Sequence, residues 1–418
     1  MKRPKVVIVG GGFGGLNAAK GLRGAALDVL VIDKTNHHLF QPLLYQVATA
    51  ALSPGEIAAP IREILRGQEN TSVIMGEVLS INKENKTLTL KDGETISYDF
   101  LILAVGARHS YFGNDSWENS APGLKTVADA LSIREHILLS FEKAERLEGS
   151  GNTEKFLNFV VVGGGPTGVE MAGAIAEVAH TTLFKNFRRI KPETAKIYLV
   201  EAAPHILPSY PEHLSIRAEK DLENLGVKVL IRTKVTRISE DGVETDGGFI
   251  PSANIIWAAG NQASPLLKTL NVPLDRQGRA IVEKDLSIPG HPEVFVIGDA
   301  ACAMDKNGKP IIGTAPPAIQ EGNYVAKLLC KGLPVEKRPP FRYFDKGYMA
   351  TIGKGKGIAV VGKWHMTGFL AWSAWCFIHI LYLIGFRNRV TVMMEWVAIF
   401  FSGQRGVRLI NRPIDMPP

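Results

Sequence analysis

The chain has 418 residues, which is enough for two or three domains with ample cores. Hydrophobic residues make up 45% and charged residues 21%, which is typical of a globular protein and excludes an intrinsically disordered one. The net charge of +7 is modest for this length, and we expect no nucleic-acid partner. The three cysteines show no CxxC pair and no metal-like spacing, which indicates a reducing compartment and no disulfide framework.

The N-terminal stretch VVIVGGGFGGLN predicts a strand, a tight turn and a helix. Gly10, Gly12 and Gly15 fit G-x-G-x-x-G, in which the glycines permit the turn, the approach of a pyrophosphate and close helix packing. The helix N-terminus then offers free N–H groups to the phosphates. Asp33 ends the next strand, near the expected spacing of about 20 residues for a ribose-binding acid. This segment therefore predicts a dinucleotide-binding site.

A second copy of this pattern begins at FVVVGGGPTGVE, with Gly163, Gly165 and Gly168. The next strand, KIYLVE, ends at Glu201, further on than usual because the basic segment FKNFRRIKPET intervenes as an expected helix end and loop. An acid at this place accepts bonds from a ribose hydroxyl and repels a 2′-phosphate, which favours NADH over NADPH. The stretches YDFLILAVGA and ANIIWAAGN are also alike, so turn, acid and Ala-x-Gly strand occur twice. We expect two dinucleotide-binding domains.

The strand EVFVIGDAA (293–301) ends in Gly-Asp, and here the chain resembles the flavoprotein disulfide-reductase-like superfamily with two dinucleotides. The resemblance implies that the first turn holds FAD, the second holds NAD(P)H, and Asp299 bonds the flavin's ribityl or phosphate portion. An ordinary helix N-cap at Asp299 is the alternative. The chain has no redox cysteine pair, which argues against a disulfide reductase, and its intact second turn argues against a sulfide:quinone reductase.

Three further stretches, 36–62, 313–322 and 344–362, resemble the type II NADH:quinone oxidoreductases, and the likeness runs from about residue 4 to residue 413. Part of that family has A-Q-x-x-x-Q where this chain has Pro316 after Ala315, so only Gln320 is carried over as a hydrogen-bond donor to the quinone. Adjacent His37 and His38 should point to opposite sides of a strand, and we expect no metal site there.

Glu170 follows the second glycine turn on the first turn of its helix, where the first copy has Asn17. The simple alternative is that its carboxylate complements the helix dipole. The resemblance instead places Glu170 beside the nicotinamide and flavin rings, where it could orient the carboxamide and join a proton path. The resemblance also places Lys346, in FDKG, near the flavin ring, where a cation would stabilise negative charge and could pair with Glu170; a solvated lysine is the alternative.

The resemblance thus implies one FAD per chain, NADH as substrate and quinone as acceptor. Glu170, Lys346 and Gln320 are the expected catalytic residues. The expected FAD-binding residues are Gly10, Gly12, Gly14, Gly15, Asp33, Lys34, Val78, Gly106, Asp299, Ala315 and Lys346. The expected NADH-binding residues are Gly163, Gly165, Gly168, Glu201, Ala259 and Gly260.

The C-terminal tail contains a stretch from 364 to 386 without Asp, Glu, Lys or Arg, which is long enough to span a membrane. Glycines, polar residues and clustered tryptophans argue instead for helices that lie in the interface, beside the cations Arg387, Arg389, Arg405, Arg408 and Arg412. We expect a peripheral, monotopic protein on the cytoplasmic face of the inner membrane. Burial of these helices in a homodimer interface is the alternative.

The predicted fold class is α/β, with two Rossmann-like, glutathione-reductase-like domains and an amphipathic helical membrane anchor. The predicted parts are an FAD domain (1–118 and 285–335), an NADH domain (119–284) and a tail (336–418). The expected reaction is ping-pong oxidation of NADH with two-electron reduction of ubiquinone or menaquinone, without proton pumping. Reduction of a soluble acceptor such as a ferredoxin, and a non-catalytic FAD- and NADH-binding redox sensor, remain as rival functions.

Overall fold

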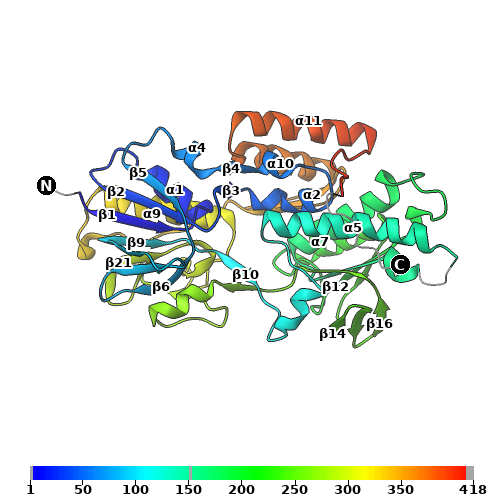
Figure 1. Ribbon diagram of the computed structural model, residues 1–418, viewed down its shortest axis with the longest axis horizontal. Helices are drawn as coiled ribbons and strands as arrows, with labels where there is room; N and C mark the ends of the chain where they lie inside the picture. Colours follow the sequence, from blue (N-terminus) through cyan, green and yellow to red (C-terminus); the bar gives the residue numbers. More distant parts are fainter. Residues whose placement is uncertain (1–2, 150–152, 411–418) are drawn as a thin grey trace. The chain divides into compact units, whose positions relative to one another are not determined.

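The computed structural model describes residues 3–149 and 153–410, and the chain divides into two compact units (Figure 1). Unit 1 comprises residues 1–39, 58–108 and 261–346; unit 2 comprises residues 40–57, 109–260 and 347–418. Both units are therefore assembled from three separate stretches of chain. The predicted division into two nucleotide domains and a tail stays a prediction, because the compact units group the segments differently.

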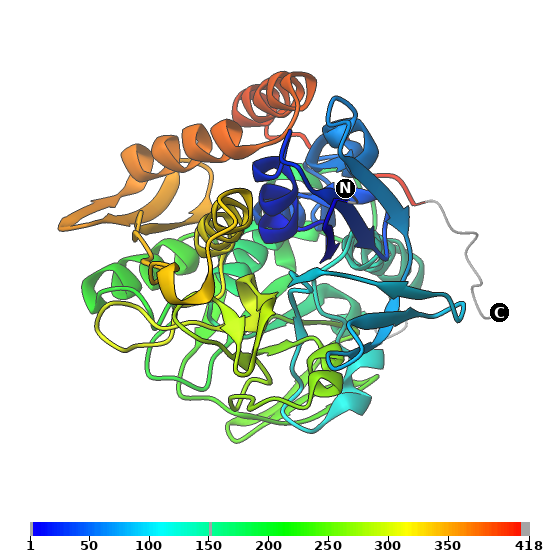
Figure 2. The same cartoon turned by 90° about the vertical axis from the view of Figure 1, so that its left-hand side faces the viewer.

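Unit 1 is built on a six-stranded sheet in the order β20-β21-β9-β1-β2-β5, in which only β20 is antiparallel to its neighbour. The strands are β1 (Lys5–Val9), β2 (Asp28–Asp33), β5 (Thr71–Met75), β9 (Phe100–Leu103), β20 (Ser287–Ile288) and β21 (His291–Val296). The run Val6–Val9 is buried throughout, as expected of a central strand covered on both faces. Helices α1 (Phe13–Gly21) and α9 (Ala315–Cys330) pack against each other (Figure 2).

The remaining elements of unit 1 are short. They are β3 (His37–Leu39), β4 (Ala58–Pro60), α4 (Ile61–Leu65), β6 (Val78–Asn82), β7 (Thr87–Leu90), β8 (Thr95–Ser97), β18 (Asn261–Ala263), β19 (Ala280–Ile281) and β22 (Ala301–Cys302). Strands β6, β7 and β8 form an antiparallel sheet whose buried side chains join the core of the parallel sheet. Strand β10 (Ala107–His109) lies where the chain passes from one unit to the other.

Unit 2 also contains a parallel sheet, which has fewer strands than the sheet of unit 1. Its parallel sheet has the order β13-β12-β11-β17, formed by β11 (Asn158–Val162), β12 (Lys196–Val200), β13 (Val227–Leu230) and β17 (Asn254–Trp257). In both units the strand before the glycine turn lies between the strand that ends in the acid and the strand before Ala-x-Gly. The duplication predicted from the sequence is therefore present in the strand order.

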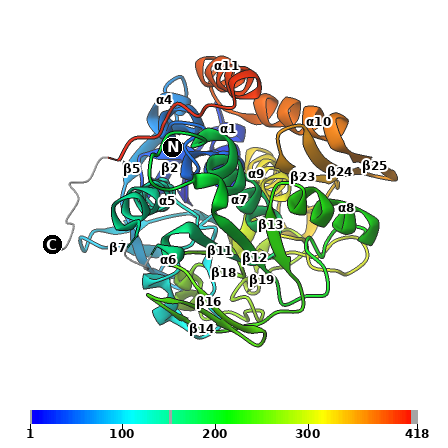
Figure 3. The same cartoon turned by 90° about the vertical axis from the view of Figure 1, so that its right-hand side faces the viewer.

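Helices and two antiparallel sheets complete unit 2. The helices are α2 (Leu44–Ala48), α3 (Pro54–Ile57), α5 (Val127–Leu147), α6 (Glu154–Leu157), α7 (Pro166–Glu177) and α8 (Glu212–Glu223). The first antiparallel sheet contains β14 (Val235–Ser239), β15 (Gly242–Thr245) and β16 (Gly248–Pro251). The second contains β23 (Tyr348–Gly353), β24 (Lys356–Val361) and β25 (Trp364–Thr367), and β23 and β24 lie against α7 and α8 (Figure 3).

The chain ends with α10 (Gly368–Tyr382) and α11 (Phe386–Ser402), which contact each other. Among the residues that the structure describes, no helix combines the length and apolar character that a membrane crossing requires. Strand β25 takes up the first four residues of the apolar stretch, which shortens α10 to 15 residues. Large apolar side chains remain exposed along both helices; Phe386 and Phe401 keep 83% and 82% of their surfaces accessible.

The predicted helix end and loop before Glu201 is confirmed. Helix α7 ends at Glu177 and continues as one π-helical turn, Val178–Thr182, before the basic loop that leads to β12. The carboxylate of Glu145, near the end of α5, accepts hydrogen bonds from the backbone N–H groups of residues 188, 189 and 190. This carboxylate fixes the path of the loop.

Candidate functional site

The glycine turn of unit 1 shows why each glycine is needed. Gly10 has φ +105°, and a Cβ there would lie 2.3 Å from the carbonyl oxygen of Ala104 on the neighbouring strand. A Cβ on Gly15 would lie 1.8 Å from the carbonyl oxygen of Gly10, so only glycine lets helix α1 approach the turn. Gly12 has no atom within 4 Å of its missing Cβ, which leaves the open face that a pyrophosphate requires.

Asp33 at the end of β2 holds this turn in place. One carboxylate oxygen accepts the backbone N–H of Gly11 at 2.6 Å, and the other accepts the backbone N–H and the hydroxyl of Thr35, both at 2.7 Å. His38, buried on β3, approaches the same turn through Nδ1, which lies 3.0 Å from the carbonyl oxygen of Gly11. Burial lowers the pKa of His38 to about 4, so its imidazole is neutral.

The glycine turn of unit 2 has the same geometry. Gly163 has φ +110°, a Cβ on Gly168 would lie 1.8 Å from the carbonyl oxygen of Gly163, and Gly165 has an open face. Glu201 corresponds to Asp33 of unit 1: its carboxylate accepts the backbone N–H of Gly164 at 2.5 Å and that of Ala203 at 2.7 Å. The unusual spacing to Glu201 therefore does not change the local arrangement.

Other expected nucleotide-binding residues lie at or near the ends of strands. Gly106 and Gly260 are the glycines of the two Ala-x-Gly segments and have φ of +65° and +72°. Ala259 precedes Gly260, Val78 begins β6, and Lys34 is exposed directly after Asp33. The roles of these residues stay predictions.

Glu170 lies on α7 and faces β23. The two elements approach so closely that a Cβ on Gly173 would lie 1.9 Å from the carbonyl oxygen of Ile352. Although an edge of Glu170 stays accessible, burial raises its pKa to about 8, against the lowering effect of a hydrogen bond with the Thr351 backbone. The side-chain amide of Asn17, its counterpart in unit 1, donates to the carbonyl oxygen of Phe13 in its own helix. Glu170 is thus a half-buried acid whose raised pKa lets it hold its proton near neutral pH.

A small cavity of about 80 Å³ lies in unit 2 next to Glu170. The polar groups on its wall include Tyr45, Gln46 and Glu177, and its other lining residues include Trp372, Trp375, Cys376, Trp396, Phe400 and Arg405. The indole N–H of Trp396 donates to the Gln46 amide oxygen at 2.7 Å, and the Gln46 amide donates to the Tyr45 hydroxyl at 2.9 Å. A cavity of this size has room for water and is smaller than the roughly 150 Å³ that holds benzene elsewhere.

The strand β21 and the turn after it bring Asp299 next to the start of α9. A Cβ on Gly313 would lie 2.9 Å from the Asp299 carboxylate, so glycine is required there. Glu321, inside α9, is buried and accepts the Gly298 backbone N–H at 2.5 Å. Burial, with a smaller contribution from the nearby Asp299 carboxylate, raises the pKa of Glu321 to about 8, against the lowering effect of the Gly298 N–H. No motif in the sequence points to Glu321, because no spacing rule links it to the Gly-Asp strand.

The side-chain amide of Gln320 is engaged at both ends. Its nitrogen donates to the carbonyl oxygen of Phe344 at 2.9 Å, and its oxygen accepts the backbone N–H of Phe344 at 3.0 Å. Lys346 follows Phe344 by two residues, so Gln320 ties the segment that carries Lys346 to α9. Ala315 is the first residue of α9, and Pro316 occupies a first-turn position that needs no N–H donor. Donation from Gln320 to a quinone stays a prediction.

These residues fall into both units. Gln320, Lys346, Asp299 and the first glycine turn belong to unit 1, whereas Glu170, Glu201 and the second glycine turn belong to unit 2. The predicted pairing of Glu170 with Lys346 therefore stays a prediction.

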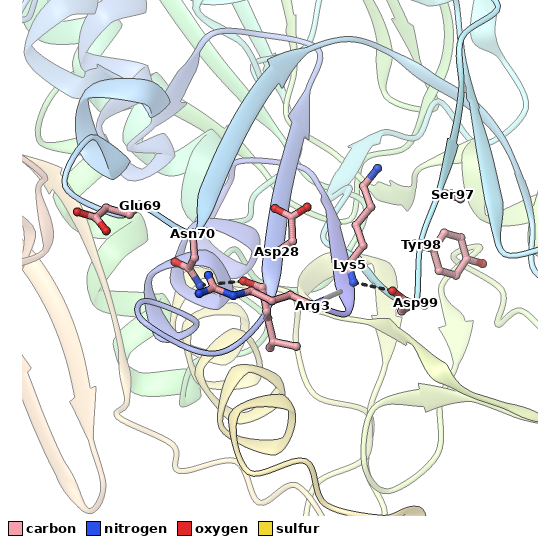
Figure 4. A pocket seen from close by; sticks show the side chains of 9 residues that line it. Arg3, Lys5, Asp28, Glu69, Asn70, Ser97, Tyr98 and Asp99 are labelled. Atoms are coloured by element: carbon pink, nitrogen blue, oxygen red, sulfur yellow. Dashed lines mark hydrogen bonds between the residues drawn. The ribbon is translucent and has the colours of Figure 1, made fainter. Parts of the chain in front are cut away.

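A second hollow lies on unit 1, at the amino ends of β1 and β2 (Figure 4). It encloses about 480 Å³ and is lined by Arg3, Lys5, Leu27, Asp28, Glu69, Asn70, Ser97, Tyr98 and Asp99. The Asp99 carboxylate accepts the Lys5 backbone N–H at 2.6 Å. Parallel sheets bind nucleotides at the carboxyl ends of their strands, so this hollow is not the nucleotide site.

Comparison with known proteins agrees with this geometry. Residues 4–322 match the model of the family described as pyridine nucleotide-disulphide oxidoreductase. The chain is 47% identical to the type II NADH:quinone oxidoreductase NdhA of Mycobacterium tuberculosis, over 98% of this chain and 90% of the relative. It is 46% identical to the enzyme Ndh of the same organism, over 97% and 90%. The structure of NDH2 from Plasmodium falciparum in complex with NADH has the same fold, with a TM-score of 0.88 and 21% identity over 97% of this chain and all of that one.

Two glycine turns of one design, each closed by an acid from the next strand, define an oxidoreductase of the class that binds two dinucleotides. The family match covers most of the chain, and the two mycobacterial relatives share nearly half of its residues along almost the whole length. The chain therefore belongs to the pyridine nucleotide-disulphide oxidoreductases and, within them, to the type II NADH:quinone oxidoreductases.

Proposed function

We propose that this protein oxidises NADH and reduces a quinone by two electrons, without proton pumping, and that it uses one bound FAD. The observation that carries the proposal is the pair of glycine turns with matching geometry, in a chain 47% identical to a type II NADH:quinone oxidoreductase. Each turn presents an open glycine face and a helix N-terminus, which together suit one pyrophosphate.

The first turn fits FAD. Gly12 leaves room for the pyrophosphate, and Gly313 leaves the Asp299 carboxylate uncovered by a side chain. The groups that would hold FAD are those of Gly10, Gly12, Gly14, Gly15, Asp33, Lys34, Val78, Gly106, Asp299, Ala315 and Lys346. When bound, FAD supplies a ring that accepts two electrons from NADH and passes them to the second substrate.

The second turn fits NADH. Gly163, Gly165 and Gly168 would receive the pyrophosphate, and Ala259 and Gly260 would lie beside the nicotinamide half. Glu201 uses one lone pair of each carboxylate oxygen for the turn. The remaining lone pairs can accept the hydroxyls of the adenosine ribose, whereas a 2′-phosphate would meet a negative charge.

Glu170 is the proposed proton-holding group. Quinone reduction by two electrons needs two protons, and a carboxyl with a pKa of about 8 can hold one near neutral pH and release it to a more basic oxygen. The polar chain of Tyr45, Gln46 and Trp396 lines the cavity beside Glu170 and offers water a place there. In unit 1, Lys346 would supply positive charge to the reacting rings, with Gln320 as its neighbour on α9.

Helices α10 and α11 are the proposed membrane attachment. Their exposed aromatic and aliphatic side chains, above all Phe386 and Phe401, would enter the lipid, while the protein stays a monotopic protein on the cytoplasmic face of the membrane. Such a position lets a quinone in the lipid reach unit 2, whose nucleotide turn serves NADH from the water. A homodimer formed through the same helices is the competing explanation for the exposed apolar surface.

The test is the visible spectrum of the purified protein through one catalytic cycle. The protein should be yellow, lose its flavin absorbance when NADH is added without oxygen, and recover it on addition of a soluble quinone such as menadione. Recovery with a ferredoxin but not with quinone would favour a soluble acceptor, and very slow recovery would favour a sensor. A colourless protein that cannot be reconstituted with FAD would contradict the proposal.

A further inference from the structure

The basic loop after α7, defined here as residues 183–191, has no role in the nucleotide sites. The side chains of Lys185, Arg188, Arg189 and Lys191 are all exposed, and the loop contains no acidic residue. The carboxylate of Glu145 accepts hydrogen bonds from the backbone of the loop, and its single negative charge offsets only one of the four positive charges. A cluster of this kind at a fixed place in unit 2 attracts anions.

Contacts within unit 2 place the start of this loop at the end of α11. The hydroxyl of Thr182 donates to the carbonyl oxygen of Gly403, the residue that follows α11, at 3.1 Å. Thr181 packs against the same glycine, where a Cβ would lie 2.9 Å from its methyl group. The guanidinium of Arg408 donates to the Thr182 carbonyl oxygen at 3.4 Å.

The two described cations after α11, Arg405 and Arg408, are engaged in contacts within unit 2. Arg405 is buried, donates to the Thr49 carbonyl oxygen at 2.8 Å and pairs with Glu177 at 2.7 Å. Arg412 lies outside the described residues. Arg405 therefore does not belong to an exposed basic cluster beside the helices, because its guanidinium holds segments of unit 2 together. At the other end of α11, Arg387 and Arg389 are exposed.

We propose that loop 183–191 is a second membrane contact, which binds the anionic headgroups of a phospholipid bilayer. The proposal rests on the membrane attachment of α10 and α11 proposed above. In this arrangement, exposed cations lie at both ends of the apolar surface of α11. Arg387 and Arg389 lie at its N-terminus, and loop 183–191 lies at its C-terminus. Such a flank between cations suits a helix that lies along an anionic bilayer.

Phe184 adds an apolar group to the same loop. Its ring is 48% exposed, and the ammonium group of Lys185 lies 5.1 Å from the ring centroid. An aromatic ring beside an ammonium group is the combination that favours the boundary between lipid headgroups and acyl chains. Each cation of the loop is expected to tighten binding to an anionic bilayer about fivefold at low salt.

The test is sedimentation of the FAD-loaded protein with vesicles, either of phosphatidylcholine alone or with added phosphatidylglycerol. The loop variant replaces Lys185, Arg188, Arg189 and Lys191 with glutamine. The matched control replaces four other exposed cations of unit 2, namely Lys220, Lys228, Lys234 and Arg237, with glutamine, so that the total charge is equal. Turnover of NADH with menadione in solution is measured for both as a check on folding.

The wild type and the control should bind the anionic vesicles more tightly than the neutral ones. The loop variant should lose at least about tenfold of its affinity for anionic vesicles, keep its affinity for neutral ones and keep its turnover. Equal losses in the loop variant and the control would overturn the loop as a lipid contact while leaving the function of α10 and α11 intact. A wild type that binds neither kind of vesicle would overturn both proposals.

Discussion

Replacement of Glu170 by glutamine should change how the stability of the protein depends on pH. The pKa of Glu170 is raised from 4.5 to about 8 by burial. Between these two values the unfolded chain has released a proton that the folded chain still holds. Rising pH therefore favours the unfolded state, and the wild type should lose stability through this window.

The size of the effect follows from the width of the window. Each pH unit is worth about 1.4 kcal/mol, so the cost at and above pH 8 is on the order of 5 kcal/mol. Glutamine keeps the shape of the side chain and does not ionise. The variant should therefore unfold at nearly the same temperature as the wild type at pH 5, and at a higher temperature at pH 8. For a domain of 150–250 residues, about 2–4 °C is expected per kcal/mol.

The assay is thermal unfolding of the FAD-loaded proteins at several pH values from 5 to about 9. Exposed Glu142, replaced by glutamine, is the control, since it lies in the same unit on the surface of α5. A difference between Glu170→Gln and the wild type that stays constant with pH would refute the raised pKa. A difference that shrinks as pH rises would mean that Glu170 is ionised and stabilised by a partner.

Three further changes test other parts of the site. Gln320→Met should remove both hydrogen bonds to Phe344 and increase deuterium exchange at the Phe344 backbone amide, with slower turnover but unchanged FAD content. Unchanged exchange at Phe344 would show that Gln320 does not hold this segment to α9. Glu201→Ala should raise the activity with NADPH relative to NADH, and a variant that still rejects NADPH would identify another acid. Arg405→Met should destabilise unit 2 by about 1.5–3 kcal/mol by removing the charged hydrogen bonds to Thr49 and to the half-buried Glu177, as chemical unfolding would show; a loss below about 1 kcal/mol would contradict this.

The repeat of turn, acid and Ala-x-Gly strand predicted the nucleotide folds because each part answers a local backbone requirement. Gly10 and Gly163 must adopt a positive φ, and Gly15 and Gly168 must leave room for a carbonyl oxygen. Because only glycine meets these requirements, the sequence alone identifies these positions. The presence of apolar helices in the tail was also predictable, since hydrophobic character is a property of a continuous stretch; their attachment to a membrane stays a prediction.

The cavity beside Glu170 could not be predicted, because it is made by residues from distant parts of the chain. Tyr45 and Gln46 come from the start, Glu177 from the middle, and Trp396 and Arg405 from the end. No periodicity connects these positions. The same limit applies to Glu321, whose hydrogen bond with Gly298 depends on how α9 packs. It also applies to Arg405, because the sequence shows only that this residue follows an apolar helix and does not show its partners.

The absence of any side chain at Gly173 has a consequence for biosynthesis. At Gly173 helix α7 leaves its backbone bare, and the carbonyl of Ile352, which is synthesised much later, packs against it. Residues 109–260 are therefore synthesised before the strand that packs against α7. This side of α7 is covered only after β23 has been made. Polypeptides that terminate before β23 lack the residues that cover this part of α7.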